Sequence, residues 1–189
     1  GYTLVTIDGE RTGHAGLNIR SRQESLSMPA EYGLADYHSH TQFAYCSENT
    51  HTTRSPRLAE LMGLRTLAMT EHSGQLYFTN DAYWGGAFAE CGVSTARPEH
   101  ARQAAYCAAT DALRSERLLV GMEIDADFDG RLVLRDDDAD RLQIRVGAVH
   151  VLREGQKPSP DPAAFVADFK QVTDQLCTAD IDVLAHPFR

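Results

Sequence analysis

Short apolar runs that alternate with helical segments are the feature that most restricts the fold of this chain. Five runs read as strands: residues 33–38, 66–70, 118–124, 143–151 and 182–185. Helical segments separate them; one begins at Ser55-Pro56 and stops at Gly63, and another begins at Asp161-Pro162. Strands joined by helices favour a parallel sheet, because parallel neighbours need crossover connections. The sequence therefore predicts an α/β sheet or barrel.

The 189 residues divide into a short extension and one domain, and 42% hydrophobic residues suffice for one core. Residues 1–33 contain an alternating stretch and an Asp-Gly turn, which predict a hairpin followed by a linker. Residues 34–189 form the predicted domain. Because five strands do not comfortably close a barrel, we expect a chain truncated after the fifth strand, with its C-terminal part missing.

Charge and cysteine usage restrict the partners. Asp and Glu number 27 against 18 Lys and Arg, for a net charge of −9. Such a surface repels phosphate backbones, so we expect no extended nucleic acid as a partner, although a metal cluster would reverse the sign locally. No apolar run approaches membrane-spanning length, which argues against a membrane partner. Four scattered cysteines and no visible secretion signal favour the cytoplasm.

Five of the eight histidines lie at or just after the ends of predicted strands: His38, His40, His72, His150 and His186. In a parallel α/β barrel, the carboxyl ends of the strands meet at one mouth, which carries the active site. A single histidine at such a position is most simply a capping or core residue. Five at successive strand ends are hard to explain in that way, so the pattern predicts a metal site.

Spacing on the first two strands selects candidate ligands. His38 and His40 are two residues apart, so their side chains share one face of the strand, together with Asp36. Asp36 could orient a histidine ring from behind. Glu71 and His72 point in opposite directions if their strand continues, so only one of them is expected to bind a metal directly. We choose His72.

The remaining strands contribute a carboxylate and two more histidines. Glu123 ends an apolar run and has two oxygens with which it could bridge two ions. Asp125 follows it, and a carboxylate that emerges to solvent explains this residue nearly as well. His150 and His186 follow the fourth and fifth strands, and either could bind a metal or donate a proton to a leaving group.

In their order along the chain, these motifs resemble those of the PHP phosphoesterases, a family named for polymerase and histidinol phosphatase. The matching segments are DxHxH at 36–40, TEH at 70–72, GxE at 121–123, VGAVH at 146–150 and AHP at 185–187. The resemblance covers residues 34–189 and implies a distorted seven-stranded (β/α) barrel with two or three divalent ions. It implies metal binding by His38, His40, His72, Glu123, His150 and His186. Among these, Glu123 is the expected bridge, and the expected catalytic residues are His38, His40, Glu123 and His186.

Two departures from the family pattern concern the ligand set. Family members commonly place a histidine or aspartate shortly after HxH, where this chain reads FAYCSE at 43–48. Cys46 is our candidate ligand there, and a thiolate would favour zinc. The alternatives are Glu48 in that role, a cysteine that is merely buried, or the absence of a third ion. The final Asp-x-His of the family has no counterpart before the chain ends at Arg189.

The resemblance implies in-line hydrolysis of a phosphate ester. Zn, Mn or Fe ions about 3.5–4 Å apart would turn a bridging water into a hydroxide nucleophile. We expect a small phosphorylated substrate, a phosphomonoester as in histidinol-phosphate phosphatases, contacted by Gln75, Tyr77 and Arg189. The alternatives are a phosphodiesterase or exonuclease acting on short nucleotides, and a noncatalytic metal-binding module. An amidohydrolase ranks last, because Lys157 and Lys170 lie in a predicted loop and helix.

Overall fold

The computed structural model describes residues 33–47, 50–95 and 102–187, so nearly all of the predicted N-terminal extension and Arg189 lie outside the described residues. One parallel sheet contains five strands in chain order: β1 (Ala35–Ser39), β2 (Thr66–His72), β3 (Leu118–Asp125), β4 (Ile144–Ala148) and β5 (Val183–Leu184). The five predicted strands are confirmed, with small differences at their ends.

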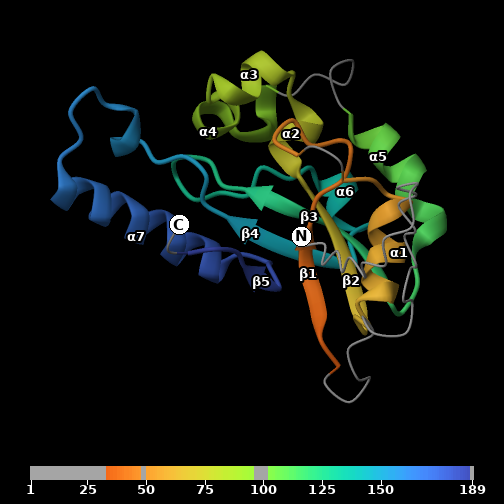
Figure 1. Ribbon diagram of the computed structural model, residues 1–189. Helices are drawn as coiled ribbons and strands as arrows, with labels where there is room; N and C mark the ends of the chain where they lie inside the picture. Colours follow the sequence, from red (N-terminus) through yellow and green to blue (C-terminus); the bar gives the residue numbers. More distant parts are fainter. Residues whose placement is uncertain (1–32, 48–49, 96–101, 188–189) are drawn as a thin grey trace, which may run out of the picture.

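Helical segments connect successive strands (Figure 1). They are α1 (Arg54–Leu61), α2 (Ser73–Tyr77), α3 (Asn80–Trp84), α4 (Ala87–Cys91), η2 (Gly92–Thr95), α5 (Gln103–Thr110), η4 (Asp111–Leu113), α6 (Asp136–Ala139), η5 (Glu154–Gln156) and α7 (Pro162–Thr178). Local sequence accounts for the start of α7, because the Asp161 carboxylate accepts a hydrogen bond from the Ala163 N–H at 3.1 Å and Pro162 occupies the first turn. Among the described residues, no helix has the length and apolar character needed to cross a membrane.

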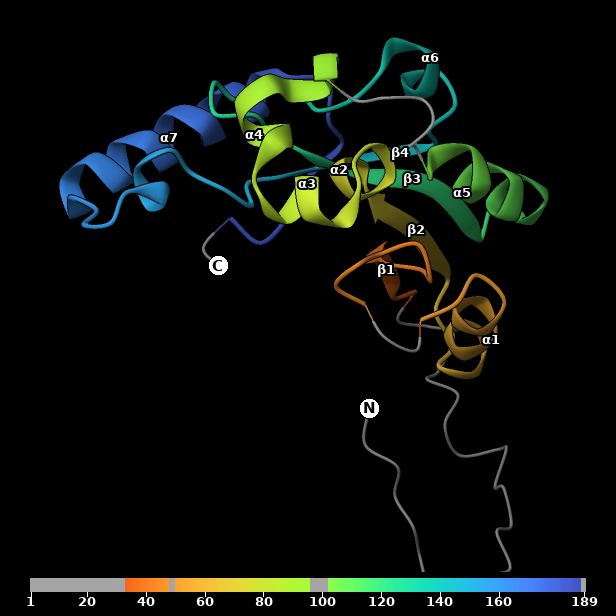
Figure 2. The same cartoon turned by 90° about the horizontal axis from the view of Figure 1, so that it is seen from above.

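The helices α1, α5 and α7 lie around one side of the curled sheet (Figure 2). On that face, Leu67 and Met69 of β2 pack in one cluster with Ala59 of α1. Val120 and Met122 of β3 likewise pack in one cluster with residues of α5. Helices on a single face and a strand order without reversal are features of a barrel rather than of a doubly wound sheet. The fold is therefore an α/β half-barrel.

Apolar side chains of the opposite face form one buried cluster: Ala68, Ile144, Val146, Ala148 and Ala185. Side chains two residues apart on a strand share a face. Ala68 of β2 therefore shares this face with His72, and Leu119 of β3 shares it with Glu123. The candidate site therefore lies on this face of the sheet, at the carboxyl ends of the strands.

Candidate metal centre

The carboxyl ends of the strands bring five histidines around one carboxylate. Glu123 is fully buried at the end of β3. A ring nitrogen of each histidine lies within 3.5 Å of one of its oxygens; the histidines are His38, His40, His72, His150 and His186. The convergence expected from their positions in the sequence is therefore present, whereas their roles as ligands and catalytic groups stay predictions.

The two carboxylate oxygens of Glu123 face different histidines. Oε2 lies 3.1 Å from Nε2 of His38, 3.5 Å from Nε2 of His40 and 2.9 Å from Nδ1 of His72. Oε1 lies 2.9 Å from Nε2 of His186 and 3.2 Å from Nε2 of His150. A carboxylate with donor atoms gathered at each oxygen has the arrangement needed to bridge two ions.

Among the residues that the structure describes, two groups of donor atoms are compact enough to hold a metal ion. One consists of His38, His40 and Glu123, and the other of His72, Glu123 and His150; within each group the donor atoms lie within 4.8 Å of one another. His186 contacts the same Glu123 oxygen as His150. Imidazole and carboxylate donors without a row of thiolates suit zinc, manganese or iron.

Three of the five buried side-chain atoms that have no hydrogen-bond partner among the described residues belong to this site: Nε2 of His38, Nδ1 of His72 and Oε2 of Glu123. They face one another at 3.1 and 2.9 Å without forming hydrogen bonds. With metal–nitrogen bonds of about 2.0–2.1 Å, neighbouring ligands of a tetrahedral ion are about 3.3 Å apart. Unpartnered buried polar atoms are costly, so this spacing fits a divalent ion.

Two buried carboxylates contact His40 and His150 at Nδ1, the ring nitrogen that does not face Glu123. Oε1 of Glu71 lies 3.2 Å from Nδ1 of His40, and Oδ1 of Asp125 lies 2.7 Å from Nδ1 of His150. His72, not Glu71, faces Glu123, as strand alternation predicted. From the sequence, Asp125 could belong to the site or emerge to solvent; in the structure it is completely buried. Its position two residues after Glu123, on the same face of β3, is the signal that could have placed it in the site.

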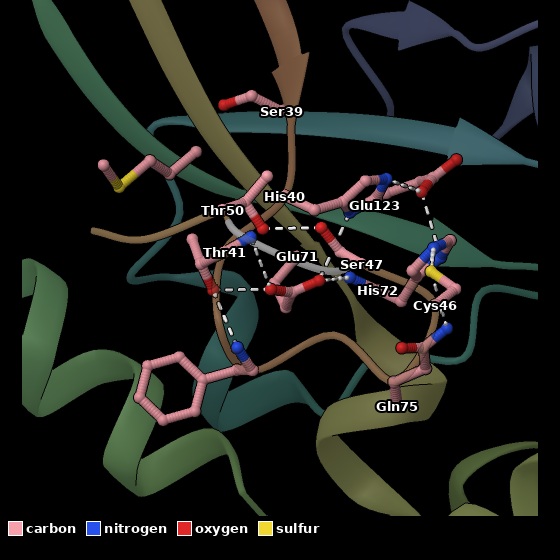
Figure 3. Close-up of polar contacts among 12 residues, drawn as sticks. Ser39, His40, Thr41, Cys46, Ser47, Thr50, Glu71, His72, Gln75 and Glu123 are labelled. Atoms are coloured by element: carbon pink, nitrogen blue, oxygen red, sulfur yellow. Dashed lines mark hydrogen bonds and ion pairs between the residues drawn. The ribbon is translucent and has the colours of Figure 1, made fainter. Parts of the chain in front are cut away.

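The loop after β1 folds against His72 and brings Cys46 close to this histidine. The Cys46 sulfur lies 3.3 Å from Nε2 of His72, the nitrogen that does not face Glu123 (Figure 3). This contact lowers the pKa of the Cys46 thiol. Cys46 thus lies outside both groups of donor atoms and contacts the other nitrogen of a candidate ligand, so its own role as a ligand stays a prediction. Glu48, the alternative, lies outside the described residues.

Gln75 and Tyr77 were expected to contact the substrate, but the structure does not support this role because both side chains are buried. Gln75 supports the loop after β1: it accepts a hydrogen bond from the Tyr45 N–H and donates one to the Cys46 sulfur at 3.4 Å. The Tyr77 hydroxyl donates to Asp138 at 2.8 Å within the core. The physical reason is that α2 begins immediately after β2 and is buried throughout.

His186 has a strained backbone. Its φ of +28° lies in the left-handed region, which residues other than glycine rarely adopt. Such a conformation costs on the order of 1–3 kcal/mol and persists where the surroundings impose it. Here the preceding Ala185 N–H donates to the Gly147 carbonyl at 2.9 Å, and the His186 ring contacts Glu123. The strain therefore coincides with a residue of the candidate site.

Charge compensation within the site shifts several pKa values. Burial raises the pKa of Glu123, but the close rings of His150, His38 and His72 outweigh it and bring that pKa well below its usual range. Burial lowers the pKa of His72, but contacts with Cys46 and Glu123 raise it to about 10. Asp125 and Glu123 similarly outweigh burial at His150 and raise its pKa to about 9. Without metal, these two histidines hold protons that compensate the buried carboxylates.

We expect the metal-free protein to lose at least about 2 kcal/mol of unfolding free energy between pH 6.5 and pH 10. Raised pKa values of His72 and His150 mean that the folded state holds protons that the unfolded state releases. This stabilisation is complete below about pH 6.5, the pKa of unfolded histidine, and is lost as pH rises through about 9 and 10. Urea unfolding in the presence of a chelator measures it.

Saturating zinc is the control for this pH dependence. Ligation requires unprotonated imidazoles, so a bound ion replaces the two protons and removes most of the decline. A flat stability profile for the metal-free protein over this pH range would contradict the proton-compensated site.

No protein-family model matches this chain, and no curated protein proves similar to it in sequence. The order of the motifs and the contacts around Glu123 are therefore the features that point to a function.

Proposed function

We propose that this protein is a metal-dependent phosphoesterase of the PHP type that hydrolyses a small phosphomonoester. The observation that carries the proposal is the Glu123 carboxylate, whose two oxygens face separate sets of histidines at the carboxyl ends of parallel strands. The half-barrel and the order of the five motifs support the PHP type.

His38 and His40 would hold one ion together with Oε2 of Glu123, and His150 and His186 a second one together with Oε1. The ring of His72 lies between these two sets of histidines. Its centroid is 4.3 Å from the centroid of the His40 ring and 4.8 Å from that of the His150 ring. When bound, zinc, manganese or iron ions would neutralise phosphoryl oxygens and lower the pKa of water. The role of the protein is to hold the donor atoms in place at the carboxyl ends of the strands.

A small substrate is favoured over a polynucleotide because the chain has a net charge of −9. Acidic surfaces repel a phosphate backbone, whereas a local cation cluster attracts a single phosphate group. We place the protein in the cytoplasm, because its four cysteines are scattered and include no CxxC pair.

The test is hydrolysis of a chromogenic phosphate monoester and of the matching diester by the metal-loaded chain. We expect the monoester to be cleaved preferentially, and a chelator to remove the activity. His38→Ala and His40→Ala should each lower monoester cleavage by about a hundredfold or more, because each removes an imidazole that faces Glu123. His51→Ala is the matched control: this exposed histidine contacts Thr53, and its variant should keep wild-type activity.

Two results would contradict the proposal in different ways. Preferential cleavage of the diester would make the protein a phosphodiesterase. Stoichiometric metal without cleavage of either ester would leave a noncatalytic metal-binding module.

A further inference from the structure

We infer that Glu71 and Asp125 are positioning residues of the metal centre, each of which fixes the tautomer and ring orientation of one histidine. The inference rests on the proposed metal site and is independent of the reaction that the site performs. It assigns a function to two buried carboxylates that do not face the centre themselves.

Glu71 is held at both of its oxygens (Figure 3). Oε2 accepts hydrogen bonds from the N–H of Thr41 at 2.9 Å and from its hydroxyl at 2.5 Å. Oε1 accepts one from the His72 N–H at 3.1 Å and lies 3.2 Å from Nδ1 of His40. A carboxylate is only an acceptor, so Nδ1 of His40 carries the proton in this contact. Nε2 of His40, which faces Oε2 of Glu123, is then the ring nitrogen left to bind an ion.

Asp125 holds His150 in the same manner. Its Oδ1 lies 2.7 Å from Nδ1 of His150 and accepts a hydrogen bond from the Tyr83 hydroxyl at 3.3 Å. Its Oδ2 accepts one from the Gly74 N–H at 2.8 Å. A Cβ at Gly74 would lie 2.9 Å from this oxygen, so the absence of a side chain there permits the close backbone contact. Asp125 is thereby fixed to the start of α2.

The two pairs serve opposite oxygens of Glu123. His40 faces Oε2 and His150 faces Oε1, so each candidate ion would have one histidine held from behind by a carboxylate. Metal-bound histidines commonly donate their other ring N–H to such a carboxylate, and its loss lowers metal affinity about 10–100-fold. The physical reason is that the carboxylate fixes the ring orientation in the metal-free protein, so the lone pair of the binding nitrogen already points toward the position of the ion.

The first test is the zinc affinity of the full chain, measured by competition with a chromophoric chelator. We expect Glu71→Gln and Asp125→Asn each to weaken binding of one ion about 10–100-fold. Thr41→Val and Tyr83→Phe are the matched controls, because each removes another hydrogen bond of the same carboxylate and leaves the histidine contact intact. These controls should bind zinc within about twofold of wild type. Equal losses in variants and controls would overturn the inference, as would unchanged affinity in Glu71→Gln and Asp125→Asn.

The second test needs no metal and does not depend on zinc affinity. Long-range proton–nitrogen NMR of the metal-free chain should show a proton on Nδ1 of His40, the nitrogen that faces Glu71. In Glu71→Gln, the side-chain amide can donate to Nδ1, so the proton should move to Nε2. A wild-type His40 without a proton on Nδ1 would overturn the inference. A chain that binds zinc and shows the expected tautomer, yet cleaves no phosphate ester, would remove the proposed reaction and leave the positioning role intact.

Discussion

Glu123→Gln is expected to lose at least one bound metal ion and to lower phosphomonoester hydrolysis by about a thousandfold, which corresponds to about 4 kcal/mol of activation free energy. Both carboxylate oxygens face imidazole nitrogens, and an amide replaces one of these acceptors by a donor. The variant also removes the negative charge that two neighbouring cations would share. Metal content per chain and steady-state hydrolysis of a chromogenic monoester measure the two effects.

Glu154→Gln provides the matched control for this experiment. Glu154 is also a buried glutamate, but it contacts Lys157 and the Asp161 N–H near the start of α7. Its variant should keep the metal content and activity of wild type, even if its stability decreases. A Glu123→Gln protein that retains two ions would exclude the bridging role of this carboxylate.

Gly121→Ala is expected to destabilise the protein by at least about 3 kcal/mol. A Cβ at Gly121 would lie 2.0 Å from the carbonyl oxygen of Ile144, its partner on β4. Backbone atoms within a sheet cannot move away as the end of a flexible side chain can. The two strands must therefore separate just below the point where β3 presents Glu123. Urea unfolding of the metal-free protein, followed by circular dichroism, measures the loss without stabilisation by bound ions.

Gly155→Ala is the control for this substitution. Gly155 lies in the exposed segment before α7, where the closest atom to an added Cβ is a Phe165 ring carbon at 3.3 Å. We expect a change within about 0.5 kcal/mol. A free energy of unfolding of Gly121→Ala within about 1 kcal/mol of the wild-type value would contradict the close approach of β3 and β4 at this position.

The strands and the main candidate residues could be predicted because they depend on local patterns. The buried strands β2 and β3 appear in the sequence as apolar runs, as expected for strands covered on both faces. The two-residue repeat of a strand then separates His72 from Glu71 and places His38 and His40 on one face of their strand. Parallel crossovers bring successive carboxyl ends to one edge, so histidines distant in sequence meet there.

The contacts around these residues required the tertiary structure. Cys46 was a candidate for a metal contact and Gln75 for a substrate contact. In the structure these two side chains contact each other, and Cys46 also contacts Nε2 of His72. The direction of a side chain in a loop, or in a helix directly after a strand, is not set by a two-residue repeat. Tyr77 illustrates this, because the short helix α2 directs its hydroxyl toward Asp138 in the core.

The residue types at the strand ends are visible in the sequence, and these types indicate a metal site. The folded chain sets how the histidines divide between the two oxygens of Glu123, and it brings Glu71 and Asp125 into contact with His40 and His150. The physical reason is that a strand fixes the face on which a side chain lies. The curl of the sheet and the loops beyond it fix which atoms come within hydrogen-bond distance.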